Sequence, residues 1–202
     1  MTTANKITIS RISLIPVFVT FAFLYGTSVQ SGNPNINWRY AALLAFAIAA
    51  LSDGLDGYVA RHYNQVSRLG ILLDPLADKA LMLAAVFTLS FARWPVSFPI
   101  WFTVFVFIRE FIILNGIAIL HRINGKVPIK PHWISKSCTV LQLTAIVWLM
   151  LDFRSDSDPP MILLYLAGFF TALSALHYIL EGVRQIKEHG KPLPGTNADG
   201  NY

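Results

Sequence analysis

The chain carries, between residues 53 and 78, the stretch Asp53-Gly54-Leu55-Asp56-Gly57-Tyr58-Val59-Ala60-Arg61, followed after eight residues by Gly70-Ile71-Leu72-Leu73-Asp74-Pro75-Leu76-Ala77-Asp78. Its four aspartates stand in a sequence that is otherwise almost entirely compatible with lipid. An ionised acid in or near a bilayer is strongly unfavourable unless it is paired, hydrated or bound to a cation. Four acids on two adjacent apolar segments need a common reason, and the simplest one is a metal ion.

Composition indicates an integral membrane protein. Of the 202 residues, 54% are hydrophobic and only 13% are charged, whereas soluble domains usually carry about a quarter charged residues. We expect one domain over residues 1–187 and a flexible cytoplasmic tail over 188–202. The net charge of +5 comes largely from basic residues beside apolar segments. This pattern favours lipid headgroups and phosphate-bearing substrates as partners over nucleic acid.

Six apolar windows are each near the ~20 residues that a bilayer requires. They cover residues 8–27, 40–60, 69–92, 96–120, 133–151 and 160–182. The sequence therefore predicts an all-α fold with six transmembrane helices. Four tryptophans near the ends of these windows predict an interfacial belt: Trp94, Trp101, Trp133 and Trp148.

The basic residues of the loops predict the orientation. Eleven fall on one side of the spans: Lys6, Arg11, Arg61, Arg68, Arg122, Lys126, Lys130, Lys136, Arg184, Lys187 and Lys191. Three fall on the other side: Arg39, Arg93 and Arg154. Cytoplasmic loops carry the excess of Lys and Arg, so both termini are expected in the cytoplasm.

The aspartates are expected to converge on one site. A turn near Gln65 puts all four at roughly 14–20 Å from the turn along two antiparallel helices, at 1.5 Å rise per residue. Asp53 and Asp56 are three residues apart and Asp74 and Asp78 four apart, so each pair shares one helix face. Oxygen-only ligation favours Mg²⁺ or Mn²⁺ over zinc, and four carboxylates could hold two such ions.

Small and basic residues accompany the acids. Gly54, Gly57 and Ala60 leave space for a ligand to approach the helix closely, and Arg61 suits a bidentate phosphate contact. Two other interpretations of the acids are a cation pathway in a transporter and salt bridges between helices. The second lacks cations, because only Lys79 and Arg61 stand nearby.

The pattern Asp-x2-Asp-Gly-x2-Ala-Arg-x8-Gly-x3-Asp-x3-Asp resembles the signature of the CDP-alcohol phosphotransferases and is complete here. The resemblance implies that an alcohol displaces CMP from a CDP-linked lipid such as CDP-diacylglycerol. It implies metal ligation by Asp53, Asp56 and Asp74. Asp78 is implied to be a further ligand or the general base that takes the proton of the acceptor hydroxyl.

The same resemblance assigns a nucleotide site. It implies CDP-binding positions at Gly57, Ala60 and Arg61, with Gly70 allowing close helix contact and Ser67 near the nucleotide. The opening Asn5-x2-Thr8-x2-Arg11 is similar to the start of related sequences, and these residues could line the nucleotide pocket. For Arg11, membrane orientation is an equal explanation.

The acceptor alcohol is less strongly indicated. Arg109, within an Arg-Glu pair, and Lys136, within Ser-Lys-x2-Thr-x2-Gln, match a pattern of the family's phosphatidylglycerophosphate synthases, which implies binding of glycerol 3-phosphate. Pro131 to Gln142 fits the eukaryotic-type cardiolipin synthases at least as well, which implies phosphatidylglycerol as the alternative. Contacts of Arg109 with neighbouring helices remain a second interpretation of that residue. By resemblance we also expect a homodimer in a bacterial inner membrane, with its site facing the cytoplasm.

Overall fold

The structure is a computed structural model that describes the backbone of residues 3–63, 68–124, 133–151 and 161–189, and the side chains of 9–52, 77–116, 133–151 and 161–184. Within these ranges the chain forms six α-helices and no strand. They are α1 (Thr3–Gln30), α2 (Ile36–Tyr63), α3 (Arg68–Phe91), α4 (Ile100–Asn124), α5 (Trp133–Leu151) and α6 (Met161–His189). The all-α prediction is confirmed, and each helix overlaps one of the six apolar windows.

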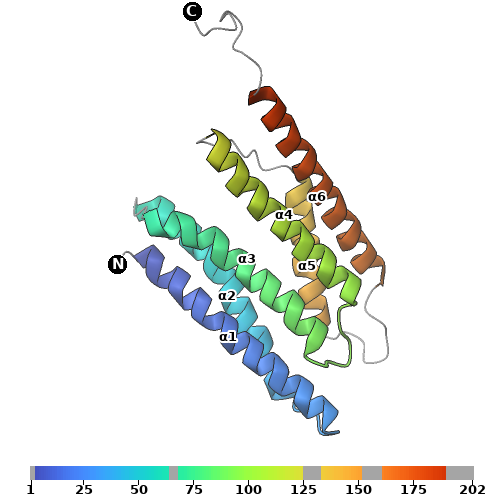
Figure 1. Cartoon of the computed structure of the whole chain (residues 1–202). Coiled ribbons are helices and arrows are strands. Elements are labelled where there is room, and N and C mark those ends of the chain that lie inside the picture. Colours follow the sequence, from blue (N-terminus) through green and yellow to red (C-terminus); the bar gives the residue numbers. More distant parts are fainter. Residues whose placement is uncertain (1–2, 64–67, 125–132, 152–160, 190–202) are drawn as a thin grey trace, which may run out of the picture.

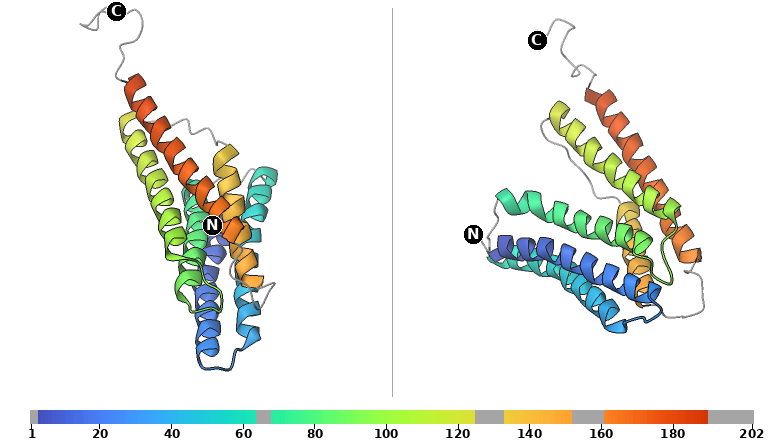
Figure 2. Two further views of the ribbon diagram at one scale, coloured as in Figure 1. Left: turned by 90° about the vertical axis from the view of Figure 1, so that its right-hand side faces the viewer. Right: turned by 60° about the horizontal axis from the view of Figure 1, so that its bottom comes forward.

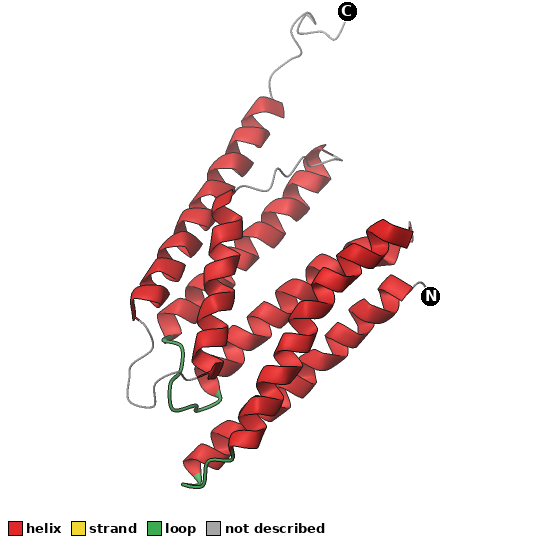
Figure 3. Cartoon of the chain, turned by 180° about the vertical axis from the view of Figure 1, so that it is seen from behind, coloured by secondary structure: helices red, strands yellow, loops and turns green. Residues whose placement is uncertain are grey.

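The helices run up and down and form two groups of three (Figure 1). In the first group α1 packs against α2 and α3, and in the second α6 packs against α4 and α5. The groups meet through α3 with α4 and α5, and through α2 with α5. Two further views show the start of α1, the end of α2, the start of α3 and the ends of α4 and α6 toward the same end of the bundle (Figure 2). Figure 3 shows the bundle from behind, and α5 of the second group contacts both α2 and α3 of the first.

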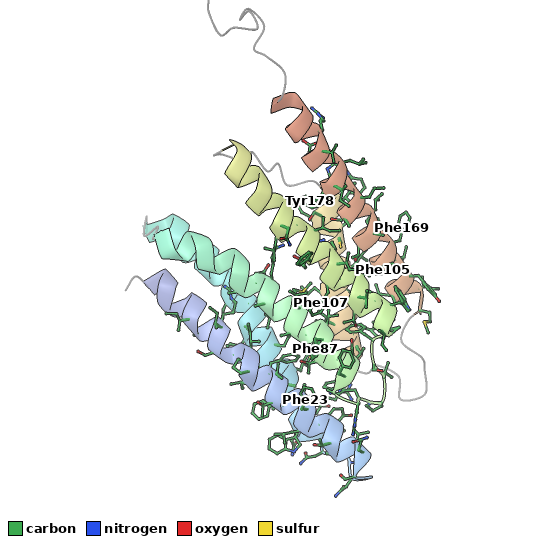
Figure 4. The ribbon with its side chains drawn as sticks, viewed as in Figure 1. Phe23, Phe87, Phe105, Phe107, Phe169 and Tyr178 are labelled. Atoms are coloured by element: carbon green, nitrogen blue, oxygen red, sulfur yellow. The ribbon has the colours of Figure 1, made fainter. Side chains whose placement is uncertain are left out.

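The outer surfaces of the helices suit a lipid environment. In the described part of the chain three helical segments are long and apolar enough to cross a membrane: Ile9–Gln30, Trp133–Leu151 and Met161–Arg184. Large aromatic side chains, among them Phe23, Phe105 and Phe169, are exposed on helices of both groups (Figure 4). Leaving such large apolar surface exposed is favourable only in an apolar surrounding. The chain therefore has the features of a membrane protein.

The apolar core fills the half of the bundle farther from the N-terminus. Phe18, Phe46, Leu89, Phe102 and Ile146 are at most 2% exposed and belong to one cluster that joins α1 to α5. Small residues let the first group pack tightly, since Ala22, Ala42, Ala45, Ala49 and Ala85 are all buried in it. The core thus fixes the helices at one end, and the buried charged residues described below lie nearer the other end.

Two details differ from the sequence-based expectations. The prediction of an interfacial position is wrong for Trp94, which is 6% exposed in the core and donates a hydrogen bond from its indole nitrogen to the carbonyl of Ala22 at 2.9 Å. The boundary at residue 187 falls inside α6, which continues to His189. The remainder of the expected tail, 190–202, lies outside the described residues.

Candidate active site

The four aspartates occupy the two helices that the sequence predicted. Asp53 and Asp56 lie on α2, ahead of its end at Tyr63, and Asp74 and Asp78 lie on α3, after its start at Arg68. The two helices pack against each other, and the end of α2 and the start of α3 lie at the same end of the bundle as the start of α1 (Figure 1). The side chains of Asp53, Asp56 and Asp74 lie outside the described residues, whereas the side chain of Asp78 is described and exposed.

A buried cation accompanies this region from α1. Arg11 is fully buried, with 0% exposure. Because α1 and α2 form an antiparallel hairpin whose turn follows Gln30, Arg11 and Asp53 are each about 20 residues from the turn and so lie at a similar height along it. A fully buried arginine is placed by packing and charge inside the protein, so surface orientation does not account for Arg11.

Three charged side chains form a connected ion-pair cluster between α3 and α4. Glu110 of α4 accepts hydrogen bonds on both carboxylate oxygens, from Lys79 Nζ of α3 on Oε2 and from Arg109 Nη1 on Oε1. The side chains of Arg109 and Glu110 are 6% and 9% exposed. Two cations share one carboxylate, so these three residues together carry one excess positive charge.

The far side of the Arg109 guanidinium points to α5 and α6. Its Nη2 donates to Ser135 Oγ at 2.8 Å and lies 3.5 Å from Ser174 Oγ. Tyr178 of α6, labelled in Figure 4, donates from its hydroxyl toward Ser135 Oγ at 3.5 Å. Arg109 Nε is buried and has no hydrogen-bond partner among the described residues. A buried arginine whose Nε donor is unused is suited to bind an anionic oxygen.

The chemistry of the acidic region fits a hard divalent cation. Lys79 directly follows Asp78 in sequence, yet its ammonium group pairs with Glu110 on α4. This lysine is thus engaged on another helix, which weakens the interpretation of the aspartates as interhelical salt bridges. Among the side chains that the structure describes there is no group of three His, Cys, Asp or Glu residues. The expected group includes Asp53, Asp56 and Asp74, which are outside that set, and the metal site remains a prediction.

The other predicted residues divide into two classes. Gly57, Ala60 and Arg61 lie in the helical backbone of α2, Gly70 in α3, and Asn5 and Thr8 in α1, with side chains outside the described set. Ser67 falls in the undescribed connection 64–67.

The two predicted acceptor residues differ in setting. Arg109 is buried in the cluster, and Lys136 on α5 is exposed beside Ser135. Gln142 of the same motif is 1% exposed and donates to Thr171 Oγ1 at 2.9 Å, so it joins α5 to α6.

Sequence reasoning did not identify the contribution of α6. Ser174 lies at Arg109 and Tyr178 lies at Ser135, and the two α6 residues are four residues apart on one helix face. That spacing of polar residues within an apolar span was the available signal. By itself this signal does not predict a site, because a single Ser or Tyr in a membrane helix usually needs no functional explanation.

Comparison with known proteins agrees with this arrangement. The family model described as CDP-alcohol phosphatidyltransferase matches residues 1–175, which include all six helices up to the middle of α6. The chain belongs to the CDP-alcohol phosphatidyltransferase family. The match contains the four aspartates and the Arg109 cluster as far as Ser174, so the buried charges of this bundle lie within the family's domain.

Individual relatives extend over nearly the whole chain. The CDP-diacylglycerol–glycerol-3-phosphate 3-phosphatidyltransferase of Bacillus subtilis is 34% identical over 91% of this chain and 96% of its own length. The protein of that name from Blochmanniella floridana is 33% identical over 86% of both chains. That of Escherichia coli K12 is 30% identical over 86% of this chain and 90% of its own.

Proposed function

We propose that this CDP-alcohol phosphatidyltransferase transfers the phosphatidyl group of CDP-diacylglycerol to glycerol 3-phosphate, giving phosphatidylglycerophosphate and CMP. The observation that carries the choice of acceptor is the buried Arg109 with its unused Nε donor, within a cluster of net positive charge. An acceptor that bears its own phosphate matches this charge. The names of the relatives, which are glycerol-3-phosphate transferases at 30–34% identity, support the same acceptor.

The reaction is a substitution at phosphorus. The glycerol hydroxyl oxygen forms a bond to the phosphorus that carries diacylglycerol, and the bond from that phosphorus to the bridging oxygen of CMP breaks. CMP leaves with the electron pair. Asp78 is proposed to accept the hydroxyl proton, and its exposed carboxylate on α3 allows it to reach a hydroxyl at the site. Arg61 is proposed to hold the diphosphate and stabilise the charge that develops on CMP.

Asp53, Asp56, Asp74 and Asp78 are proposed to hold Mg²⁺ or Mn²⁺, as one or two ions. When bound, such a cation would neutralise the diphosphate and stabilise the leaving phosphate. The packing of α2 against α3 and the spacing of the aspartates on each helix support this assignment. Gly57, Ala60, Gly70, Ser67, Asn5 and Thr8 are proposed to surround the nucleotide.

The setting in the membrane is also a proposal. We infer that all six helices span the bilayer, with both termini and the aspartates toward the cytoplasm of a bacterial inner membrane. Two facts support this inference: the N-terminus and the end of α6 are at the same end of the bundle (Figure 1), and the loop charges are asymmetric. The exposed aromatic residues on the outer helix faces could contact lipid or a second copy of the chain in a homodimer.

The test uses purified protein in mixed micelles with CDP-diacylglycerol, Mg²⁺ and either glycerol 3-phosphate or phosphatidylglycerol. Phosphatidylglycerophosphate formed with stoichiometric CMP is the expected result. Cardiolipin formed only with phosphatidylglycerol would replace the proposed acceptor by the alternative one. If no CMP formed with either acceptor, the enzymatic proposal would be overturned, and the cation pathway of a transporter would become the better interpretation of the aspartates. Asp78→Asn serves as the inactive control.

A further inference from the structure

We propose that Glu110 is a positioning residue that joins the acceptor site to the acidic site. The inference rests on the proposed function, because it concerns how glycerol 3-phosphate and Asp78 are brought together. Neither the motif that contains the aspartates nor the charge asymmetry of the loops predicts a role for this carboxylate. Its contacts do.

Glu110 lies where the two groups of helices meet. The aspartates belong to α2 and α3 in the first group, while Arg109 and its partners Ser135 and Ser174 belong to α4, α5 and α6 in the second. Glu110 on α4 reaches across to Lys79 on α3. This ion pair connects the two groups through opposite charges.

Glu110 also holds the Arg109 side chain in place. The guanidinium is nearly buried, and Glu110 Oε1 accepts from its Nη1 while Ser135 and Ser174 lie at Nη2. These contacts fix both ends of the planar group, so the remaining Nε donor has a defined direction. Because a rigid, planar donor is favourable for binding phosphate only when it is held in place, removal of the Glu110 charge should weaken phosphate binding.

Through Lys79, Glu110 also contacts α3. Lys79 directly follows Asp78, and neighbouring residues on a helix point about 100° apart. When Lys79 is held toward α4, the rotation of α3 about its axis is fixed and so is the direction of Asp78. Glu110 therefore acts on the acceptor through Arg109 and on the general base through Lys79. Loss of the first action should raise KM for the acceptor, and loss of the second should lower kcat.

The experiment compares wild type, Glu110→Gln, Glu110→Asp, Lys79→Met and the double variant Lys79→Met/Glu110→Gln. Initial rates are measured against each substrate in turn, and the thermal midpoint is measured with and without glycerol 3-phosphate. Glu181→Gln is the matched control, since Glu181 is a partly exposed carboxylate on α6 paired with Arg184 at 3.8 Å. We expect this control to keep wild-type constants.

For Glu110→Gln we expect KM for glycerol 3-phosphate to rise about 10-fold or more and kcat to fall about 10-fold, with KM for CDP-diacylglycerol within 2-fold of wild type. Lys79→Met should lower kcat and leave the acceptor KM within about 2-fold, because the Arg109–Glu110 pair remains. The double variant should resemble Glu110→Gln, since both substitutions break the same contact. Glu110→Asp should restore the acceptor KM, because its carboxylate still reaches the adjacent Arg109.

The stabilisation by glycerol 3-phosphate gives a readout that does not depend on turnover. A bound ligand raises the thermal midpoint of the wild type, and this rise should be lost in Glu110→Gln and retained in Glu110→Asp. The inference is overturned if Glu110→Gln keeps the acceptor KM, raises KM for both substrates equally, or lowers only the thermal midpoint. Failure of the proposed function is a separate result, because it would appear as absence of phosphatidylglycerophosphate in the wild-type reaction.

Discussion

Gly26 of α1 lies directly against the backbone carbonyl of Ala92, just after the end of α3. A Cβ atom added to Gly26 would be 1.5 Å from the Ala92 oxygen and 2.8 Å from its carbonyl carbon. No side chain fits at that distance, so the glycine sets how closely α1 approaches α3. Since α3 carries Asp74 and Asp78, this contact far from the aspartates determines the position of their helix.

Gly26→Ala is therefore expected to destabilise the protein by about 1–3 kcal/mol or more, because backbone atoms must move to relieve the clash. Gly182→Ala on α6 is the matched control: nothing lies within 4 Å of the added Cβ, and alanine is favoured over glycine in a helix by about 1 kcal/mol. Thermal unfolding in detergent, followed by circular dichroism, measures both. Equal midpoints for the two variants would contradict the close packing of α1 on α3.

A second prediction concerns Gln142, which belongs to a motif associated with the acceptor. The structure gives it a packing role, since it is buried and bonded to Thr171 of α6. Gln142→Leu should lower stability by about 0.5–2 kcal/mol, the range of buried interhelical hydrogen bonds in membrane proteins. The acceptor KM should stay within about 2-fold of wild type. A selective rise in that KM would instead assign Gln142 to the substrate.

The sequence predicted the helices well because each is a long apolar segment between Gly, Pro and charge clusters, a pattern that depends only on local composition. The aspartates were found in the same way, since an acid in a lipid-compatible segment is conspicuous and its spacing of three or four is a helix period. The Lys79–Glu110 pair is different. It joins residues 31 positions apart in the chain, and nothing in the local pattern says which cation a carboxylate will meet.

The burial of Trp94 is likewise not predicted by the local sequence. Its position beside Arg93 and Pro95 at the end of a span is typical of an interfacial tryptophan. The actual position depends on two contacts with α1: Tyr25 packs edge-on at 4.7 Å between ring centroids, and the carbonyl of Ala22 accepts the indole hydrogen. Such complementarity arises from tertiary packing and is absent from hydropathy.

A third prediction tests Arg109 itself. Arg109→Lys retains the charge but loses the planar fork that contacts Glu110 and Ser135 at once. We expect kcat/KM for glycerol 3-phosphate to fall about 10- to 100-fold, as for loss of a charge-assisted hydrogen bond. Arg93→Lys, which alters a bond to Gln30 at the other end of the bundle, should keep wild-type kinetics. An unchanged acceptor constant in Arg109→Lys would remove Arg109 from the acceptor site.

A fourth prediction concerns metal removal. Treatment with EDTA should abolish CMP release, and added Mg²⁺ or Mn²⁺ should restore it, whereas Zn²⁺ should not, because an all-oxygen ligand set suits hard cations. Asp53→Asn should raise the Mg²⁺ concentration needed for half-maximal rate, since it removes one anionic ligand. The measurement is the initial rate over a metal titration. Full activity in EDTA would exclude a role of metal in the reaction.

Asp78→Asn separates catalysis from binding. Asp78 lies on α3 next to Lys79, which is held by Glu110, so the amide variant should keep the fold and the direction of the side chain. Removing a general base typically lowers turnover by about 10²–10⁴-fold. We therefore expect almost no phosphatidylglycerophosphate, while CDP still raises the thermal midpoint because the nucleotide contacts proposed for α2 are unchanged. If Asp78→Asn turned over at the wild-type rate, another group would have to take the hydroxyl proton, and Asp78 would be at most a ligand of the metal.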